Sequence, residues 1–145
     1  YTEGWALYAE RIAFADMAVY DQDPLGNLGR LQDEMFRAVR LVVDTGMHAK
    51  RWSREKAIDY MRVKTGLTQA EVTREIERYV VWPGQATSYK VGQQAILAVR
   101  AKAELALGEQ FDSRLFHEAL LSSGAMPLAI LEWNIDQWIA QQKAK

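Results

Sequence analysis

The first ten residues, Tyr1 to Glu10, constrain the fold more than any other stretch of the sequence. From Gly4 to Ala9 every residue is apolar or aromatic, and a carboxylate stands on either side of this run, Glu3 before it and Glu10 after it. In a helix, seven residues turn the chain through about 700°, so the two carboxylates lie on one side, two turns apart. A helix that is apolar all round is usually buried.

Carboxylates are rarely buried unless they are paired with a cation or bound to a metal. We therefore expect a cationic partner to face both Glu3 and Glu10. The sequence of this stretch allows two kinds of partner. One is a pair of arginines elsewhere in the fold, which would make both carboxylates structural, and the other is a metal ion.

The composition excludes several classes of protein. With 145 residues, 49% of them hydrophobic, the chain is long enough to bury a core, and intrinsic disorder is not expected. Its net charge of −1 provides no basic excess for binding nucleic acid or an acidic membrane. No apolar run approaches the roughly 20 residues that span a bilayer. The chain has no cysteine, which excludes disulfides and thiolate metal sites but leaves the cellular compartment open.

Helix start and stop signals recur along the chain and predict an all-α fold of about seven helices in a single domain. The clearest are the capping box that opens with Thr68 and the break at Pro83. No strand-like alternation, repeat or low-complexity tract is present. The expected helices cover residues 2–20, 31–45, 53–64, 68–82, 85–107, 112–122 and 127–142.

Glycine residues set the expected limits of the second helix. Two of them fall in residues 25–30, which we expect to form a short connection before the helix begins. Gly46 is a natural helix stop. His48 should therefore lie in the connection that follows the second helix.

Residues 3–10, Glu-Gly-Trp-Ala-Leu-Tyr-Ala-Glu, resemble the E-G-W-A-x-Y-x-E segment of a bacterial metallopeptidase-like family catalogued as domain of unknown function 885 (DUF885). The resemblance covers essentially the whole chain, because further matching segments follow in the same order. They are residues 37–48, 78–79, 83–92, 116–121 and 124–128. Such proteins resemble gluzincins of the thimet oligopeptidase and carboxypeptidase Taq type. In these helical zinc peptidases an H-E-x-x-H helix supplies two zinc ligands and a downstream glutamate supplies the third.

The sequence departs from this pattern in one respect. It contains only two histidines, His48 and His117, and neither belongs to an H-E-x-x-H motif. The resemblance therefore implies that the chain is the C-terminal part of a larger peptidase domain. Its partner would be an upstream N-terminal lobe that carries the two histidine ligands, and the chain alone should be inactive.

The resemblance assigns the two carboxylates of the first helix to a zinc site. Glu3 matches the third zinc ligand, and zinc readily accepts a carboxylate oxygen. Glu10 suits a supporting role, in which it accepts a hydrogen bond from a ligand histidine and fixes the tautomer of that ring. An ordinary salt bridge is the alternative for Glu10.

Tyr89 and His48 are the candidates for stabilising the oxyanion that forms during peptide hydrolysis. Tyr89 follows the break at Pro83, where related peptidases place a tyrosine hydroxyl that donates to the oxyanion. Core packing is the alternative for this side chain, because any buried tyrosine needs a partner for its hydroxyl. His48 could reach the site as a second donor, and the alternative for it is a structural histidine whose ring nitrogens are satisfied within the fold. His117, within a helical run, is expected to be a packed or partly exposed structural residue.

Residues on either side of Pro83 are candidates for substrate binding, namely Tyr79, Gln85 and Arg78. A guanidinium group offers two parallel donors to a peptide carboxylate, so Arg78 or Arg40 could bind one. The same arginines could instead neutralise Glu10 or Asp44. The sequence does not decide between these roles.

These observations lead to one main functional hypothesis and one alternative. The main hypothesis is a zinc-dependent peptidase, in which a metal-activated water attacks the peptide bond and the glutamate of the upstream H-E-x-x-H motif acts as general base. This chain would supply the third zinc ligand, Glu3, and the residues for the oxyanion and the substrate. The alternative is a non-catalytic helical binding or scaffolding module, in which Glu3 and Glu10 are only ion-paired.

Overall fold

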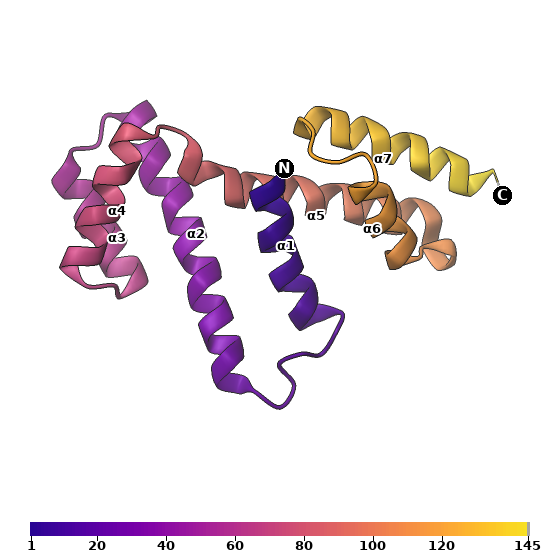
Figure 1. Cartoon of the computed structure of the whole chain (residues 1–145), viewed down its shortest axis with the longest axis horizontal. Coiled ribbons are helices and arrows are strands. Elements are labelled where there is room, and N and C mark those ends of the chain that lie inside the picture. Colours follow the sequence, from indigo (N-terminus) through magenta and orange to yellow (C-terminus); the bar gives the residue numbers. More distant parts are fainter. Residues whose placement is uncertain (145) are drawn as a thin grey trace.

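The computed structural model describes residues 1–144, which are predominantly helical (Figure 1). Seven α-helices and two short 3-10 helices make up this part of the chain, and it contains no strand. The predicted all-α fold of about seven helices is confirmed. The elements in order are α1 (Thr2–Ala15), α2 (Pro24–Lys50), α3 (Arg54–Thr65), α4 (Gln69–Val81), η1 (Gln85–Thr87), α5 (Ser88–Leu107), η2 (Gly108–Gln110), α6 (Ser113–Leu121) and α7 (Leu128–Lys143).

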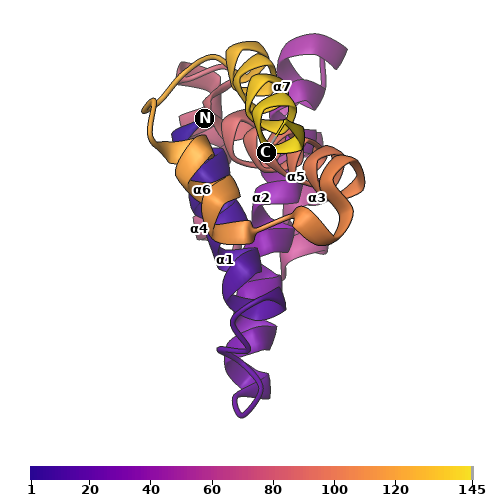
Figure 2. The ribbon, with the colours of Figure 1, turned by 90° about the vertical axis from the view of Figure 1, so that its right-hand side faces the viewer.

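Helix α5 runs through the middle of the molecule and connects its two ends (Figure 1). Helices α2, α3 and α4 gather at one end of α5, and α6 and α7 pack at the other. Helix α1 crosses α5 between these groups. The connection between α1 and α2 lies at the tip of an arm that points away from α5 (Figure 2). Within residues 1–144, no helix has both the length and the apolar character that crossing a membrane requires.

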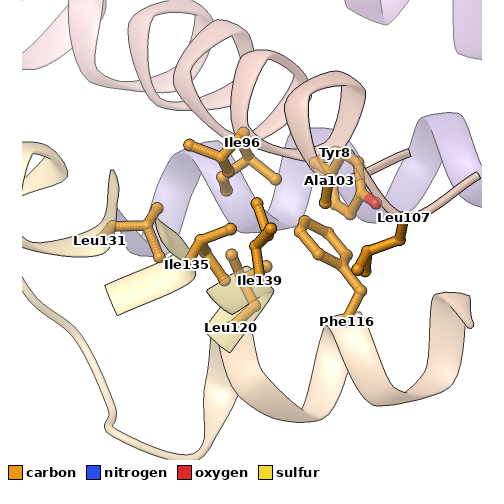
Figure 3. Packing of buried hydrophobic residues seen from close by; sticks show 10 residues of the cluster. Tyr8, Ile96, Ala103, Leu107, Phe116, Leu120, Leu131, Ile135 and Ile139 are labelled. Carbon is orange, nitrogen blue, oxygen red and sulfur yellow. The ribbon is translucent and has the colours of Figure 1, made fainter. Parts of the chain in front are cut away.

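The two ends of the molecule have separate hydrophobic cores. The first, called here the α5–α7 core, also includes Tyr8 from α1 (Figure 3). The second, the α2–α4 core, is closed by Ala86 of η1. The buried members of the α5–α7 core are Tyr8, Ile96, Val99, Ala103, Leu107, Phe116, Leu120, Leu131, Ile135 and Ile139. Those of the α2–α4 core are Val39, Val43, Ala57, Ile58, Met61, Val72, Ile76, Tyr79 and Ala86.

Helices α1 and α5 cross in backbone contact at a pair of glycines. A Cβ atom on Gly4 would lie 2.3 Å from the carbonyl carbon of Gly92, and one on Gly92 would lie 2.7 Å from the Cα of Gly4. Only glycine fits at such an approach. The crossing places Glu3 beside the part of α5 that lies one turn after Tyr89.

Helix α1 ends at Ala15, five residues earlier than predicted. The apolar residues Met17 and Val19, which lie in the part predicted to be helical beyond Ala15, are exposed. Ala18 has a φ of 54°, and the chain turns there. Extending the helix would bury no further apolar surface at the tip of the arm, so nothing stabilises the additional turn.

Helix α2 is longer than predicted at both ends. It begins at Pro24, where the Asp23 side chain accepts a hydrogen bond from the Gly26 amide, 2.8 Å away. Gly46 does not end the helix. The ring of Trp52 packs so closely that a Cβ atom at Gly46 would lie 2.6 Å from it, so the glycine serves packing. The left-handed cap is Arg51, with a φ of 55°.

The capping signals predicted the other helices closely. Ser53 caps α3, Thr68 forms the predicted capping box of α4, and Asp112 caps α6. The predicted helix 85–107 begins instead with the 3-10 turn η1. Hydroxyl groups explain this tight turn, because Thr87 donates to the Gly84 carbonyl at 2.7 Å and Ser88 donates to the Gln85 carbonyl at 2.7 Å.

Candidate functional site

The two carboxylates of α1 have different surroundings. Glu3 is partly exposed and has no hydrogen bond or ion pair within residues 1–144. Glu10 forms an ion pair with Arg37 of α2, with an N–O distance of 3.6 Å. Of the two kinds of partner expected for these carboxylates, an arginine pairs with Glu10, and no arginine of the described chain pairs with Glu3. Ala6 is also exposed, so α1 has a solvent-facing side and is not buried all round.

The surroundings of Glu10 only partly offset the cost of burying its negative charge. Burial raises the pKa of this carboxyl group, and the nearby charges of Asp33 and Glu34 act in the same direction. Arg37 opposes them. The ion pair uses Oε1 of Glu10 and leaves Oε2 without a partner in the described chain.

A second cluster of polar residues lies where α2, α4, η1 and the start of α5 meet, and this region is called here the junction. The residue that links these elements is Asp44, a buried residue of α2. Both carboxylate oxygens accept a hydrogen bond from the Gly84 amide, at 3.0 and 3.1 Å. Gly84 has a φ of 84°, a conformation that favours glycine. Asp44 thus holds the break between α4 and α5 against α2.

His48 lies in the last turn of α2, not in the connection predicted for it. Its Nδ1 atom is 3.0 Å from the main-chain oxygen of Asp44 and 3.2 Å from Oδ1 of the same residue. Because both neighbours are acceptors, Nδ1 must carry the proton. The neutral ring then has no proton on Nε2, so His48 can donate to a ligand from Nε2 only as the imidazolium.

Tyr89 is the second residue of α5 and is partly buried. The guanidinium carbon of Arg40 lies 4.3 Å from the centre of its ring. The hydroxyl group has no hydrogen-bond partner within residues 1–144. A tyrosine that only fills a core usually bonds its hydroxyl inside the protein. The ring of Tyr89 is therefore held in place by Arg40, while its hydroxyl group bonds no other group of the described chain.

The three residues predicted to bind substrate have partners within the chain. Tyr79 is buried and its hydroxyl donates to Glu75 at 2.7 Å. Arg78 contacts the same carboxylate at 2.5 Å. Gln85 accepts a hydrogen bond from Arg40 at 2.8 Å.

The shared carboxylate explains two pKa shifts. Burial, together with the hydrogen bond to Glu75, raises the pKa of Tyr79 far above its usual range. Burial alone would raise the pKa of Glu75 as well, but the hydrogen bonds from Arg78 and Tyr79 outweigh it and lower that pKa. Glu75 is the residue of this group that the sequence analysis missed. Its spacing from Arg78 and Tyr79, three and four residues, is the helical signal that could have revealed it.

Most of the predicted site residues therefore converge on the junction. Glu3 lies outside it, next to Gly4, which packs against Gly92 of α5. His117 does not take part, as predicted. It lies on α6, with Nε2 2.9 Å from the hydroxyl oxygen of Tyr8. The proposed neutralisation of Glu10 or Asp44 by Arg40 or Arg78 is wrong, because these carboxylates bond Arg37, His48 and the Gly84 amide instead.

The carboxylate of Glu3 is suited to be a metal ligand, since it is accessible and no cation of the described chain neutralises it. A catalytic zinc site needs three protein ligands. Residues 1–144 contain no group of three histidine, cysteine, aspartate or glutamate side chains that could hold a metal ion. Glu3 fits the role of one ligand in a larger set.

Comparison with known proteins identifies the family. The model of a family described as bacterial protein of unknown function (DUF885) matches residues 1–135, and the chain belongs to this family. The chain is also similar to a crystal structure described as "the putative lipoprotein from Colwellia psychrerythraea", with 53% sequence identity and a TM-score of 0.94. The match covers 97% of this chain and 24% of that one, so the chain spans about a quarter of the length of its relative. We found no match among curated proteins.

Proposed function

We propose that this chain forms the C-terminal helical lobe of a zinc-dependent peptidase. One observation carries the proposal. Glu3 and Tyr89, which the sequence motifs assign to the zinc and to the oxyanion, both lack a polar side-chain partner in the described chain. Glu10, Tyr79 and Gln85, to which supporting roles were given, all have one. His48, the other candidate for the oxyanion, is bonded to Asp44 through Nδ1.

In this proposal Glu3 provides one zinc ligand, and two histidines outside this chain provide the others. When bound, zinc would activate a water molecule for attack on the peptide carbonyl. Glu10 lies two turns after Glu3, and its Oε2 atom would accept a hydrogen bond from a ligand histidine while Oε1 stays with Arg37.

Tyr89 donates its hydroxyl proton as a hydrogen bond to the developing oxyanion. Arg40 stacks on the ring and fixes its direction, which makes the donor ready before the reaction begins. His48 is the secondary donor and acts only when protonated, for the tautomeric reason given above. Tyr79, Arg78 and Gln85 shape the wall of the substrate site through their contacts with Glu75 and Arg40.

The alternative, a non-catalytic helical module, is favoured by the Glu10–Arg37 ion pair. It gives no reason for the unpaired carboxylate of Glu3 at a tightly packed helix crossing, or for the unpaired hydroxyl of Tyr89. The peptidase gives a reason for both.

Two substitutions in the complete polypeptide, which also carries the histidine ligands, test the proposal. Tyr89→Phe should lower kcat about a hundred- to a thousandfold, as loss of one oxyanion donor typically does, and leave the zinc content unchanged. Glu3→Gln should lower the zinc content, because an amide is an uncharged and poorer ligand. Tyr60→Phe, a tyrosine that packs against Trp52 in the α2–α4 core, is the matched control and should retain normal turnover. Normal turnover in Tyr89→Phe would remove Tyr89 from the mechanism.

A further inference from the structure

Arg40 is a buried arginine that has no acidic partner within residues 1–144. Its residue exposure is 4%, yet no carboxylate of the described chain lies within ion-pair distance. Arg30, the other buried arginine, pairs with Glu34 at 3.0 Å. Buried charges are normally paired, and leaving one without a partner is costly. The surroundings of Arg40 therefore point to a partner from outside this part of the chain.

Aromatic rings hold the guanidinium group in place. Its central carbon lies 4.3 Å from the ring centre of Tyr89, 5.4 Å from that of Tyr79 and 5.6 Å from that of Phe36. Such cation–π contacts offset part of the cost of burying the charge but use none of its N–H donors. Rotation of the group would break them, so its donors point in a fixed direction.

The five donors of the group are mostly unused. Nη2 donates to Gln85 at 2.8 Å. Nε is sealed from solvent and has no partner. Nη1 also has no acceptor in the described chain, but unlike Nε it is not completely sealed from solvent. Glu75 feels the positive charge of Arg40, but its hydrogen bonds go to Arg78 and Tyr79.

The ligand class follows from these donors. A fixed guanidinium with an open donor edge matches the two oxygens of a carboxylate. Because the guanidinium carbon lies 4.3 Å from the centre of the Tyr89 ring, a carboxylate bound by Arg40 would lie near the Tyr89 side chain. If the hydroxyl of Tyr89 faces the oxyanion of the scissile bond, the carboxylate belongs to a residue very near that bond.

We propose that Arg40 binds the free C-terminal carboxylate of a peptide and thereby directs cleavage to bonds close to the C terminus. The identification of the ligand as a peptide rests on the proposed function. Binding of the carboxylate needs neither zinc nor turnover, so the two proposals can fail separately.

The test is an NMR titration of the complete polypeptide that follows the Arg40 Nε–H resonance. The probe is acetyl-alanyl-alanine as the free acid, compared with the same dipeptide as its C-terminal amide. The free acid should shift the resonance in a saturable manner and bind at least tenfold more tightly than the amide. Arg100, whose Nε donates to Glu104 at 2.8 Å, gives the internal control and should not shift. Equal binding of acid and amide, or no shift of Arg40, would overturn the proposal.

Two further measurements identify the residue and the source of the carboxylate. Arg40→Lys keeps the charge but loses the planar donor edge, and should reduce binding of the free acid about tenfold. The acid–amide comparison on the native chain stands even if this variant is unstable. Acetyl-glutamic acid diamide carries only a side-chain carboxylate and should bind as weakly as the dipeptide amide. If it binds as well as the free acid, the site recognises acidic side chains and the assignment to the C terminus is wrong.

Discussion

Arg100 and Arg40 each approach tyrosines at the edge of a core, but their bonding differs. In the α5–α7 core, Arg100 contacts Asp16 at 2.7 Å and Glu104 at 2.8 Å, and it donates to the Tyr8 hydroxyl at 3.1 Å. At the junction, Arg40 has aromatic neighbours and one hydrogen bond to Gln85, and it pairs with no carboxylate of the described residues. Arg100 thus joins two carboxylates and a hydroxyl group in one network, whereas Arg40 lacks an acidic partner within the described residues.

The pKa of Arg100 reflects its complete network. Burial would lower it, but the hydrogen bonds to Asp16 and Glu104 outweigh burial and raise it. A cavity of about 370 Å³ lies beside this cluster, yet several of its polar wall groups already bond one another. The presence of a cavity therefore does not by itself mark a functional site. Unsatisfied donors at well-fixed side chains distinguish the junction better.

The largest expected effect concerns the helix crossing that brings Tyr8 and Asp16 to Arg100. In Gly4→Ala the new Cβ atom would lie 2.3 Å from the backbone of Gly92, so α1 must move away from α5. We expect this change to lower the free energy of unfolding by about 3 kcal/mol, the upper part of the range for overpacking. Urea denaturation measures it.

The matched control for that substitution is Gly29→Ala in α2. A Cβ atom there meets nothing within 4 Å, so the higher helix propensity of alanine should raise the free energy of unfolding by up to about 1 kcal/mol. If Gly4→Ala changes the free energy of unfolding by no more than this control does, close packing at the crossing is not needed to hold the Arg100 network together.

The next prediction compares the stability that is lost when each of the two arginines is replaced by methionine. Arg100→Met leaves Asp16 and Glu104 without their cation, and we expect a loss of about 2 kcal/mol after allowing for the partial exposure of these groups. Arg40→Met removes one hydrogen bond but leaves no carboxylate without its cation. It should therefore lower the free energy of unfolding by no more than about 1 kcal/mol. Thermal and urea unfolding of both variants give the order. The reverse order would mean that Arg40 is the more structural residue.

Local signals predicted most of the helices but not the long-range contacts. Capping residues such as Ser53 and Thr68 act on the next turn of the chain, so the sequence shows their effect directly. Gly46 misled the prediction of α2 because its role depends on Trp52, which packs against it from beyond the end of the helix.

The same limit applies to the candidate site. The motif around Pro83 located Tyr89, and the resemblance singled out Glu3, but neither predicts whether these groups find a partner. The bonds that decide the matter connect residues far apart in the sequence. Asp44 bonds Gly84 and Tyr8 bonds Arg100, and only the packing of α1 and α2 against η1 and α5 brings these pairs together.

The smallest effect tests whether the Arg100 network is closed by a neutral histidine. Arg100 donates to the Tyr8 hydroxyl oxygen, so the hydroxyl proton is free to bond Nε2 of His117. This bond requires an unprotonated Nε2. Burial lowers the pKa of His117, and the charge of Arg100 lowers it further.

The sign of the pH dependence follows from this lowered pKa. Below about pH 6.5 the unfolded chain protonates His117 while the folded chain does not, so protons favour unfolding. Stability should fall as the pH drops from about 6.5 toward the folded pKa, by well under about 1 kcal/mol because the ring is only partly buried. Urea unfolding of the native chain and of His117→Gln, each at pH 7.5 and 5.5, isolates this contribution from that of carboxylates such as Glu10, whose raised pKa acts in the opposite direction. The native chain should lose more stability than the variant between these two values. If the variant loses as much stability as the native chain, His117 does not accept a hydrogen bond from the Tyr8 hydroxyl. The contrast between a fully bonded Tyr8 hydroxyl and the unbonded hydroxyl of Tyr89 would then be weaker than described above.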